Sequence, residues 1–218
     1  PIKKNYKEDI LHHKKTFLIK ESFKNILTTL RSISQYRNVS LFLIAFFLFI
    51  DGAHTVIYLA ADFALNVGLK ANDVIPALIL VQFVAFPATI LWGFIADKYG
   101  DKPVLFITII FYIFIIFFST TLSSAFEFYI LAILVGGVQG GIQGSSRSLY
   151  GKIIPPEKAG EFFGIYNVLG RAGAIFGPLM VGGLLALYGD IRISLLPIAV
   201  LFILGGLVLL KVKESNEI

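Results

Sequence analysis

The amino-acid sequence predicts an all-α membrane protein with six transmembrane helices. Hydrophobic residues make up 56% of the 218 residues and charged residues only 15%, whereas about 25% of a soluble domain is charged. Several apolar runs approach the roughly 20 residues with which a helix crosses a bilayer. Because lipid offers the backbone no hydrogen-bond partners, we expect these runs to be helices.

The apolar runs define the predicted spans within a transmembrane region that covers residues 39–211. The spans cover about residues 39–61, 74–96, 103–119, 128–146, 162–187 and 191–210. Their lengths are close to the roughly 17–25 residues of a spanning helix, and the third is the shortest. Prolines inside the second, fifth and sixth spans are tolerated there as kinks.

Residues 1–38 differ from the spans in composition and are predicted to be a cytoplasmic segment. Their apolar residues recur at helical spacing, at Phe23, Ile26, Leu27, Leu30 and Ile33. With basic residues on the rest of the turn, this pattern predicts an amphipathic helix on the membrane surface; the alternative is a solvated basic linker. The chain opens without methionine or a signal-peptide pattern, so we expect it to be a piece of a longer protein.

The positions of lysine and arginine predict the orientation in the membrane. With six spans both termini lie on one side, and that side holds all 19 basic residues except Lys70, Arg171 and Arg192. Basic residues gather on the cytoplasmic side, so the termini, including a tail at residues 212–218, are predicted to be cytoplasmic. The net charge of +5 is therefore not interpreted as nucleic-acid binding. The many lysines, isoleucines and phenylalanines favour a bacterial inner membrane over a vacuolar one.

Polar residues follow one face of the first span. Asp51, His54, Thr55 and Tyr58 are spaced so that they align along a helix. An aspartate at mid-membrane costs roughly 2.5–3.5 kcal/mol on insertion scales, and such residues normally face a cavity or a partner. We therefore assign this stripe to a pathway for substrate or protons. The alternatives are that Asp51 bonds a neighbouring helix for packing and that His54 is a neutral hydrogen-bonding partner.

Further polar candidates lie in the second and fourth spans. Gln139, Gln143 and Arg147 recur at four-residue steps beside a string of glycines, whose spacing lets helix backbones approach closely. The two glutamines are predicted either to line the pathway or to bond a neighbouring helix. Gln82 in the second span is another candidate, with packing as its alternative role.

The fifth span carries an amide, a cation and a glycine–proline motif. Asn167 and Arg171 lie four residues apart on one face. An arginine inside a span usually meets an acid, a substrate carboxylate or carbonyl groups, although Arg171 could also extend to the interface. Gly173 and Gly177, followed by Pro178, are predicted to form a hinge.

The loop after the second span, "GFIADKYGDKP", resembles the signature loop of the major facilitator superfamily. The matching residues are Gly93, Asp97, Lys98, Gly100 and Lys102. Asp101 stands where the family usually has another basic residue, which leaves the charge pairing of the loop open. The "GPLMVGG" of the fifth span also looks like the gate hinge of that superfamily. We therefore assign to gating the five matching loop residues, the hinge residues Gly173, Gly177 and Pro178, and Arg147.

Longer stretches, such as "DGAHTVIYLA" and "GSSRSLYGKIIPPEKAGEFFGIYNVLGRAGAIFGPL", are similar to one branch of this superfamily. That branch contains the vacuolar amino-acid effluxer associated with autophagy and its bacterial relatives. The resemblance implies that the chain is the C-terminal six-helix half of a larger transporter, with residues 1–38 in the central loop. Its implied partners are the lipid bilayer, an N-terminal six-helix half and a small-molecule solute, without nucleic acid.

The resemblance implies a secondary active transporter that moves a small polar solute by alternating access. Neutral amino acids are the implied solute, and proton coupling is expected. A siderophore, peptide or drug exporter and a membrane scaffold without transport activity are the alternatives. The sequence contains no motif of a metalloprotease, serine hydrolase or phosphate loop, so no enzyme activity, catalytic residue, cofactor or metal is predicted.

Overall fold

The computed structural model describes residues 33–214, and every regular element in that range is helical. The helices are α2 (Arg37–Asn66), α3 (Ala71–Tyr99), α4 (Asp101–Thr121), α5 (Ala125–Ile153), the short 3-10 helix η1 (Pro156–Lys158), α6 (Ala159–Ala172), α7 (Phe176–Tyr188) and α8 (Ile191–Leu210). Six segments in this range are long and apolar enough to cross a membrane, with η1, α6 and α7 together forming the fifth. The predicted all-α membrane protein with six spans is thus confirmed.

Several helices extend beyond the predicted spans, because the predictions followed only the apolar residues. Helix α5 continues from the apolar run to Ile153, and α3 continues through Lys98 to Tyr99. The polar ends of such helices project beyond the hydrocarbon layer. The amphipathic helix predicted before residue 33 and the last four residues of the tail lie outside the described residues.

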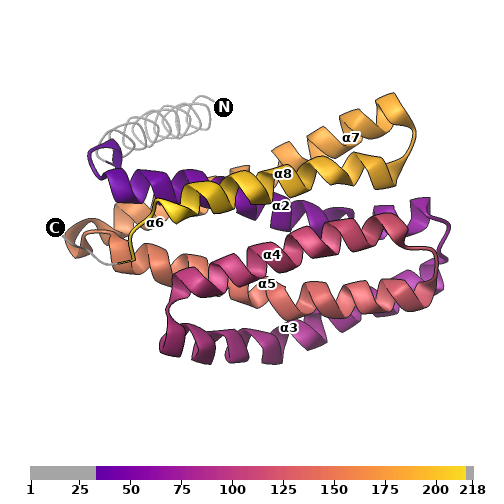
Figure 1. Ribbon diagram of the computed structural model, residues 1–218, viewed down its shortest axis with the longest axis horizontal. Helices are drawn as coiled ribbons and strands as arrows, with labels where there is room; N and C mark the ends of the chain where they lie inside the picture. Colours follow the sequence, from indigo (N-terminus) through magenta and orange to yellow (C-terminus); the bar gives the residue numbers. More distant parts are fainter. Residues whose placement is uncertain (1–32, 215–218) are drawn as a thin grey trace, which may run out of the picture.

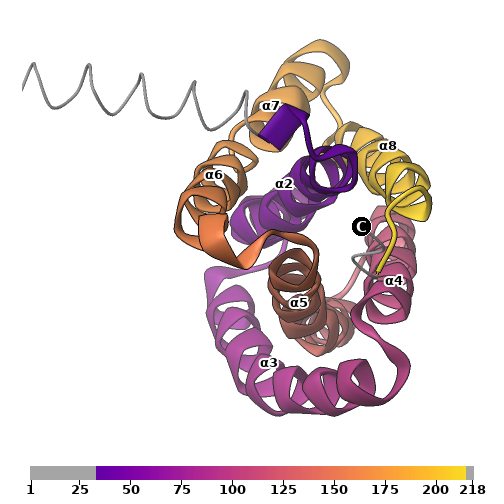
Figure 2. The same cartoon turned by 90° about the vertical axis from the view of Figure 1, so that its left-hand side faces the viewer.

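The helices run along the long axis of the molecule (Figure 1). Viewed from one end, α2 and α5 lie towards the middle, with α3, α4, α8, α7 and α6 around them (Figure 2). The most extensive contacts join α3 to α5 and α2 to α8. The two inner helices therefore carry the side chains that can face either the core or a cavity.

The core is rich in aromatic side chains, and large apolar side chains also cover the outside. Phe42, Phe49 and Tyr112 are completely buried, and the ring of Tyr112 stacks on Phe202 with 4.9 Å between centroids. On α3, in contrast, Phe83 and Phe86 are each 74% exposed. An apolar surface of this kind suits a lipid environment.

One end of the bundle brings together the start of α2, the α3–α4 turn and the residues after α8. The Asn38 side chain donates to the Lys213 carbonyl at 2.9 Å, and the Lys213 N–H donates to Asn38 Oδ1 at 2.8 Å. Lys102 Nζ donates to the Val212 carbonyl at 2.6 Å. Elements far apart in the sequence are thus tied together at the end that the sequence assigns to the cytoplasm.

Glycines on α5 allow its close packing against α3. A Cβ atom at Gly136 would lie 2.6 Å from the carbonyl oxygen of Val81, and one at Gly141 would lie 2.8 Å from the Trp92 ring. Trp92 Nε1 donates to the carbonyl of Gly137 at 2.6 Å, across the same interface. A Cβ at Gly137, however, would meet no atom within 4 Å. Only some of the glycines in the string are therefore required by packing.

The fifth span is divided in two, whereas the sequence predicted one span with a hinge. Helix α6 ends at Ala172 and α7 begins at Phe176, with a turn at residues 173–175 between them. Glycine is a poor helix former and proline cannot donate a backbone hydrogen bond. Gly173, Gly177 and Pro178, the residues assigned to the hinge, lie in or directly after this break.

We expect Gly136→Ala to destabilise the protein by about 1–3 kcal/mol, the usual cost of overpacking, because its methyl group would collide with the α3 backbone. The matched control is Gly137→Ala, which places the same group in open space on the same helix. Thermal melting of the purified protein, followed by the loss of monodisperse protein, measures the difference. Equal melting temperatures for the two variants would contradict the packing described for α3 and α5.

Candidate functional site

An open cavity of about 380 Å³ lies between α2, α5 and α6. Its polar lining consists of His54, Tyr58, Gln143, Arg147, Asn167 and Arg171. Five of these residues were predicted to line a pathway, and Arg147 was assigned to gating. Side chains that are far apart in the sequence thus meet around one cavity.

Two residues of the cavity lie near the middle of their spans. At about 1.5 Å per residue, His54 lies about 26 Å along α2 from its start at Arg37. Arg171 lies about 18 Å along α6 from its start at Ala159. Helix α2 has 30 residues, about 45 Å, and the fifth span has 33 residues, about 50 Å, so both side chains lie far from the ends of their spans.

One wall of the cavity is built from stacked aromatic rings. Tyr166 stacks on Phe46 with 4.2 Å between centroids and on Tyr150 with 5.0 Å. The Tyr150 hydroxyl donates to the carbonyl of Phe162 at 3.0 Å, which fixes the buried ring. Offset ring pairs of this kind add to the stability gained from burial. The wall is therefore a rigid apolar surface beside the polar groups.

The cations of the cavity have no acidic partner within the described chain. Arg147 lies over the Phe163 ring, 5.2 Å from its centroid. Among residues 33–214, the ion pair within 4.0 Å joins Lys152 to Asp101, and neither Arg147 nor Arg171 takes part in one. Arginines inside a span usually pair with an acid or with carbonyl groups. The cavity therefore offers two positive charges to a negatively charged group.

Asp51 and Thr55 lie behind the cavity and not in its lining. They are 1% and 0% exposed, and Thr55 Oγ1 donates to the Asp51 carbonyl at 2.7 Å. The Asp51 carboxylate faces the backbone amides of Phe176 and Gly177 at the start of α7. The predicted stripe is thus divided, with Asp51 and Thr55 towards α7 and the other two residues towards the cavity.

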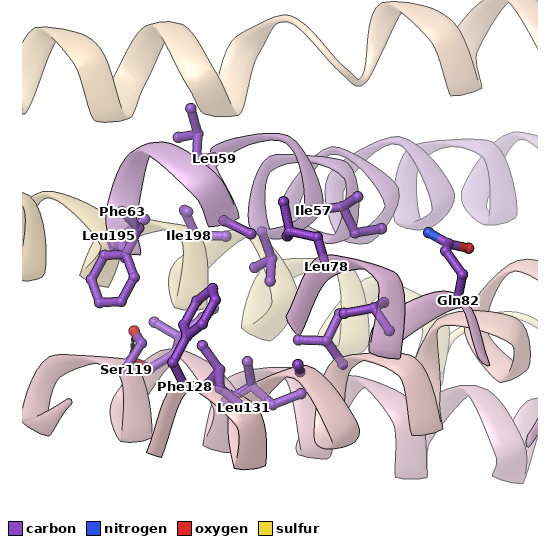
Figure 3. A pocket seen from close by; sticks show the side chains of 17 residues that line it. Ile57, Leu59, Phe63, Leu78, Gln82, Ser119, Phe128, Leu131, Leu195 and Ile198 are labelled. Atoms are coloured by element: carbon purple, nitrogen blue, oxygen red, sulfur yellow. Dashed lines mark hydrogen bonds between the residues drawn. The ribbon is translucent and has the colours of Figure 1, made fainter. Parts of the chain in front are cut away.

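Gln82 lies at a different cavity. Figure 3 shows it at one edge of an apolar space of about 120 Å³ that is bounded by α2, α3, α4, α5 and α8. The rest of this lining is apolar apart from Ser119, whose hydroxyl donates to the Ile116 carbonyl at 2.7 Å. Gln139 lies outside both cavities, and its buried Oε1 has no hydrogen-bond partner. Neither glutamine joins the polar cavity.

The predicted gating loop is divided between two environments. Gly93 and Asp97 line a separate space of about 210 Å³ on the inner side of α3. Lys98 is exposed, and its Nζ lies 5.2 Å from the centroid of the Tyr99 ring. Gly100 turns the chain between α3 and α4 at a φ of +94°, a conformation that glycine adopts without strain.

Asp101, the residue that departs from the superfamily pattern, is the buried centre of the charge pairing. Its Oδ2 accepts from Lys152 Nζ at 2.7 Å and from the Ser148 hydroxyl at 2.8 Å. The backbone N–H of Asp101 donates to the Glu214 carboxylate at 2.8 Å. Lys102 instead holds the residues after α8. The loop therefore pairs with α5 and with the end of the described chain.

The sequence analysis missed the apolar lining of the cavity. This lining consists of Phe46, Ile50, Tyr166, Gly170 and Ala174. In the sequence these residues cannot be told from ordinary core residues, because they are not part of a polar stripe. Ile50, Gly170 and Ala174 lie three or four residues from His54, Asn167 or Arg171, and this spacing was the available signal, because such neighbours share a helix face.

The sequence matches the family described as vacuole effluxer Atg22 like over residues 3–217. It is 33% identical over 204 residues to the uncharacterized MFS-type transporter YxiO of Bacillus subtilis, covering 94% of this chain and 48% of that protein. Autophagy-related protein 22-1 of Penicillium rubens is 30% identical over 199 residues, which are 83% of this chain and 33% of its own. Autophagy-related protein 22 of Coccidioides immitis is 30% identical over 201 residues, which are 84% of this chain and 33% of that protein.

The chain therefore spans about half the length of the bacterial relative and about a third of the fungal relatives. The family is described as an effluxer and the bacterial relative as a transporter, which agrees with the prediction that the protein is not an enzyme.

We expect Asp101→Ala to destabilise the protein by about 1.5–3 kcal/mol, the usual contribution of a hydrogen bond to a charged group. The substitution removes the acceptor for Lys152 and Ser148. Asp97→Ala on the same loop is the control, because Asp97 is exposed and accepts no hydrogen bond from a described residue. Melting temperatures compare the two variants, and a larger loss in Asp97→Ala would contradict the assignment of Asp101 as the buried centre.

Proposed function

This chain belongs to the vacuole effluxer Atg22-like family, and on that premise we propose that it forms the C-terminal six-helix half of a secondary transporter. An N-terminal six-helix half would complete the path across the membrane. Two observations support this proposal: the chain covers 48% of its bacterial relative, and its polar cavity is open and not enclosed by the described residues. A second half could close it.

The observation that carries the proposal is the pair of arginines without an acidic partner among the described residues, beside an aromatic wall in a cavity between three helices. Arg147 and Arg171 suit a carboxylate, because a guanidinium binds it with paired hydrogen bonds. The wall of Phe46 and Tyr166 suits an apolar side chain. A neutral amino acid such as leucine combines both groups, and we propose this class as the solute.

Transport would proceed by alternating access, with the two halves moving around the cavity. The α6–α7 break adjoins the cavity and is the proposed hinge. The loop around Gly100 and Lys102 would hold the cytoplasmic end closed in one state. His54, which lines the cavity, and Asp51, which lies behind it, are the proposed groups for proton coupling.

The proposed location is a bacterial inner membrane with cytoplasmic termini. The excess of lysine and arginine at one side of the bundle supports this orientation. The 33% identity to a Bacillus subtilis protein supports a bacterial membrane over a vacuolar one.

We expect Arg171→Gln to reduce leucine exchange into proteoliposomes by about tenfold or more, since it removes a charge-assisted contact with the solute carboxylate. Labelled leucine flux is measured with and without a proton gradient on the full-length protein. The control is Arg37→Gln, the same substitution at the exposed start of α2. Leucine accumulation that follows the imposed gradient would support proton coupling.

Equal exchange in Arg171→Gln and Arg37→Gln would remove Arg171 from the solute site. If the wild-type protein moves no leucine, siderophores, peptides and drugs are tested next in the same vesicles. Flux of one of these would replace the amino-acid proposal with an exporter of that class. No flux of any of them would favour a membrane scaffold.

A further inference from the structure

The start of α7 leaves two backbone donors without acceptors inside the helix. The first N–H groups of a helix have no partner in their own helix. Leu179 N–H already donates to the Ile175 carbonyl at 3.2 Å, and Pro178 has no N–H. Ile175, the residue before α7, provides no side-chain cap. Phe176 and Gly177 therefore hold the two orphan donors, within a membrane span.

A side chain from another helix faces these two donors. The Asp51 carboxylate, on α2, lies next to Gly177, where an added Cβ atom would be 3.2 Å from Asp51 Oδ2, and the backbone amides of Phe176 and Gly177 interact with it. Asp51 is 1% exposed, and its Oδ1 has no hydrogen-bond partner. A negative charge at a helix N-terminus is stabilised by the helix dipole. Asp51 thus performs across two helices what a capping residue performs within one.

The glycine at position 177 is what lets α2 come this close. A Cβ atom there would overlap the Thr55 hydroxyl and would lie 3.2 Å from Asp51 Oδ2. At Gly173, on the other side of the break, a Cβ would lie 3.2 Å from the Ile50 side chain. By contrast, a Cβ at Gly183, further along α7, would meet no atom within 4 Å. On α7, a side chain is therefore excluded by α2 at Gly177 but not at Gly183.

The break also connects the Asp51 cap to the cavity. The N–H of Ala174 donates to the carbonyl of Arg171 at 3.2 Å, so Arg171 takes part in the turn that precedes α7. The side chains of both residues line the cavity. A change in the angle between α6 and α7 would therefore move the Arg171 guanidinium relative to α2 and α5.

We propose that Asp51 is a positioning residue for the solute site: its ionised carboxylate caps α7 from α2, holds the α6–α7 junction and fixes Arg171. This inference rests on the proposed function and assigns Asp51 a role other than direct contact with solute. A proton taken up at Oδ1 would leave Oδ2 as a neutral acceptor, and neutral hydrogen bonds are about half as strong as charge-assisted ones. Protonation would thereby loosen the junction and change the position of Arg171.

The groups that act on Asp51 are mainly backbone amides. The helices around Asp51 carry several other ionisable side chains: Arg37, His54, Tyr58 and Asp62 on α2, Glu127, Tyr129, Arg147, Tyr150 and Lys152 on α5, Glu161, Tyr166 and Arg171 on α6, Tyr188 on α7 and Arg192 on α8. Tyr188 and Arg192 belong to the opposite end of the bundle, where Arg192 donates to the Leu122 carbonyl at 2.6 Å. His54, Arg147 and Arg171 line the cavity. A pH response of the cap must therefore be tested against His54.

Amide hydrogen exchange of the full-length protein, in lipid nanodiscs without solute, reads the cap directly. Fragmentation of the exchanged protein resolves the amides of Phe176 and Gly177. Their exchange rates are measured at about pH 5 and about pH 8 and divided by the intrinsic exchange rates at the same pH. We expect protection in the wild type to fall at the lower pH. In Asp51→Asn the protection of these two amides should be about tenfold lower at the higher pH, consistent with loss of a hydrogen bond to a charged group. Their protection in this variant should also no longer depend on pH. His54→Gln should keep the wild-type profile.

Two glycine variants provide a test that leaves Asp51 in place. Gly177→Ala should push the carboxylate away and reproduce the loss of protection, whereas Gly183→Ala, the same change on the same helix, should not. Protection of both amides in Asp51→Asn equal to that of the wild type would overturn the cap. An even loss of protection across α5 and α8 would overturn it too, because Asp51 would then be a general packing residue.

Modification of Arg171 by phenylglyoxal, followed by mass spectrometry, tests the positioning role. Its reactivity relative to Arg147, which lines the same cavity, should change at least about twofold in Asp51→Asn. An unchanged ratio would overturn the positioning of Arg171. Neither measurement uses a solute, so a failure of leucine transport would defeat the proposed function and leave this test intact.

Discussion

In a lipid bilayer every backbone N–H must find an acceptor within the protein, and this constraint underlies the structure. Five of the six spans meet it with nearly continuous helices. The fifth is interrupted near the middle of its length, so the donors at the start of α7 need an acceptor from outside that helix. Asp51 lies where such an acceptor is needed, and Gly177 leaves it the room. A costly buried charge and a costly helix break thereby stabilise each other.

The sequence predicted which segments form helices, but it did not predict which neighbouring helix each face would meet. Long apolar runs identify spans because only a helix satisfies the backbone in lipid. The polar stripe of the first span was recognised, yet Asp51 faces α7 while His54 faces the cavity. On a helix, three residues correspond to a rotation of about 300°, so two residues of one stripe can meet different neighbours. The periodicity of the sequence shows which residues share a helix face, but not which helix packs against that face.

The same limit explains two other differences. Arg147, at the end of the predicted fourth span, was assigned to gating, but α5 continues to Ile153 and Arg147 lines the cavity. Gln82 was grouped with the pathway because it is polar, whereas it adjoins an apolar space between other helices. Asp101 left the charge pairing of the loop open in the sequence. Its partner Lys152 lies on another helix, so a pattern of neighbouring residues could not identify the pair.

The hydrogen bonds between Asn38 and Lys213 have a consequence for how such proteins arise. They place the entry and the exit of the six-span unit side by side, at the same membrane face. A unit with adjacent ends can be joined to another in tandem by one connecting segment, without rethreading the chain through the bilayer. Because an even number of spans returns the chain to its starting side, the second unit would insert in the same orientation. Gene duplication and fusion could therefore extend this architecture without a change in the fold of either unit.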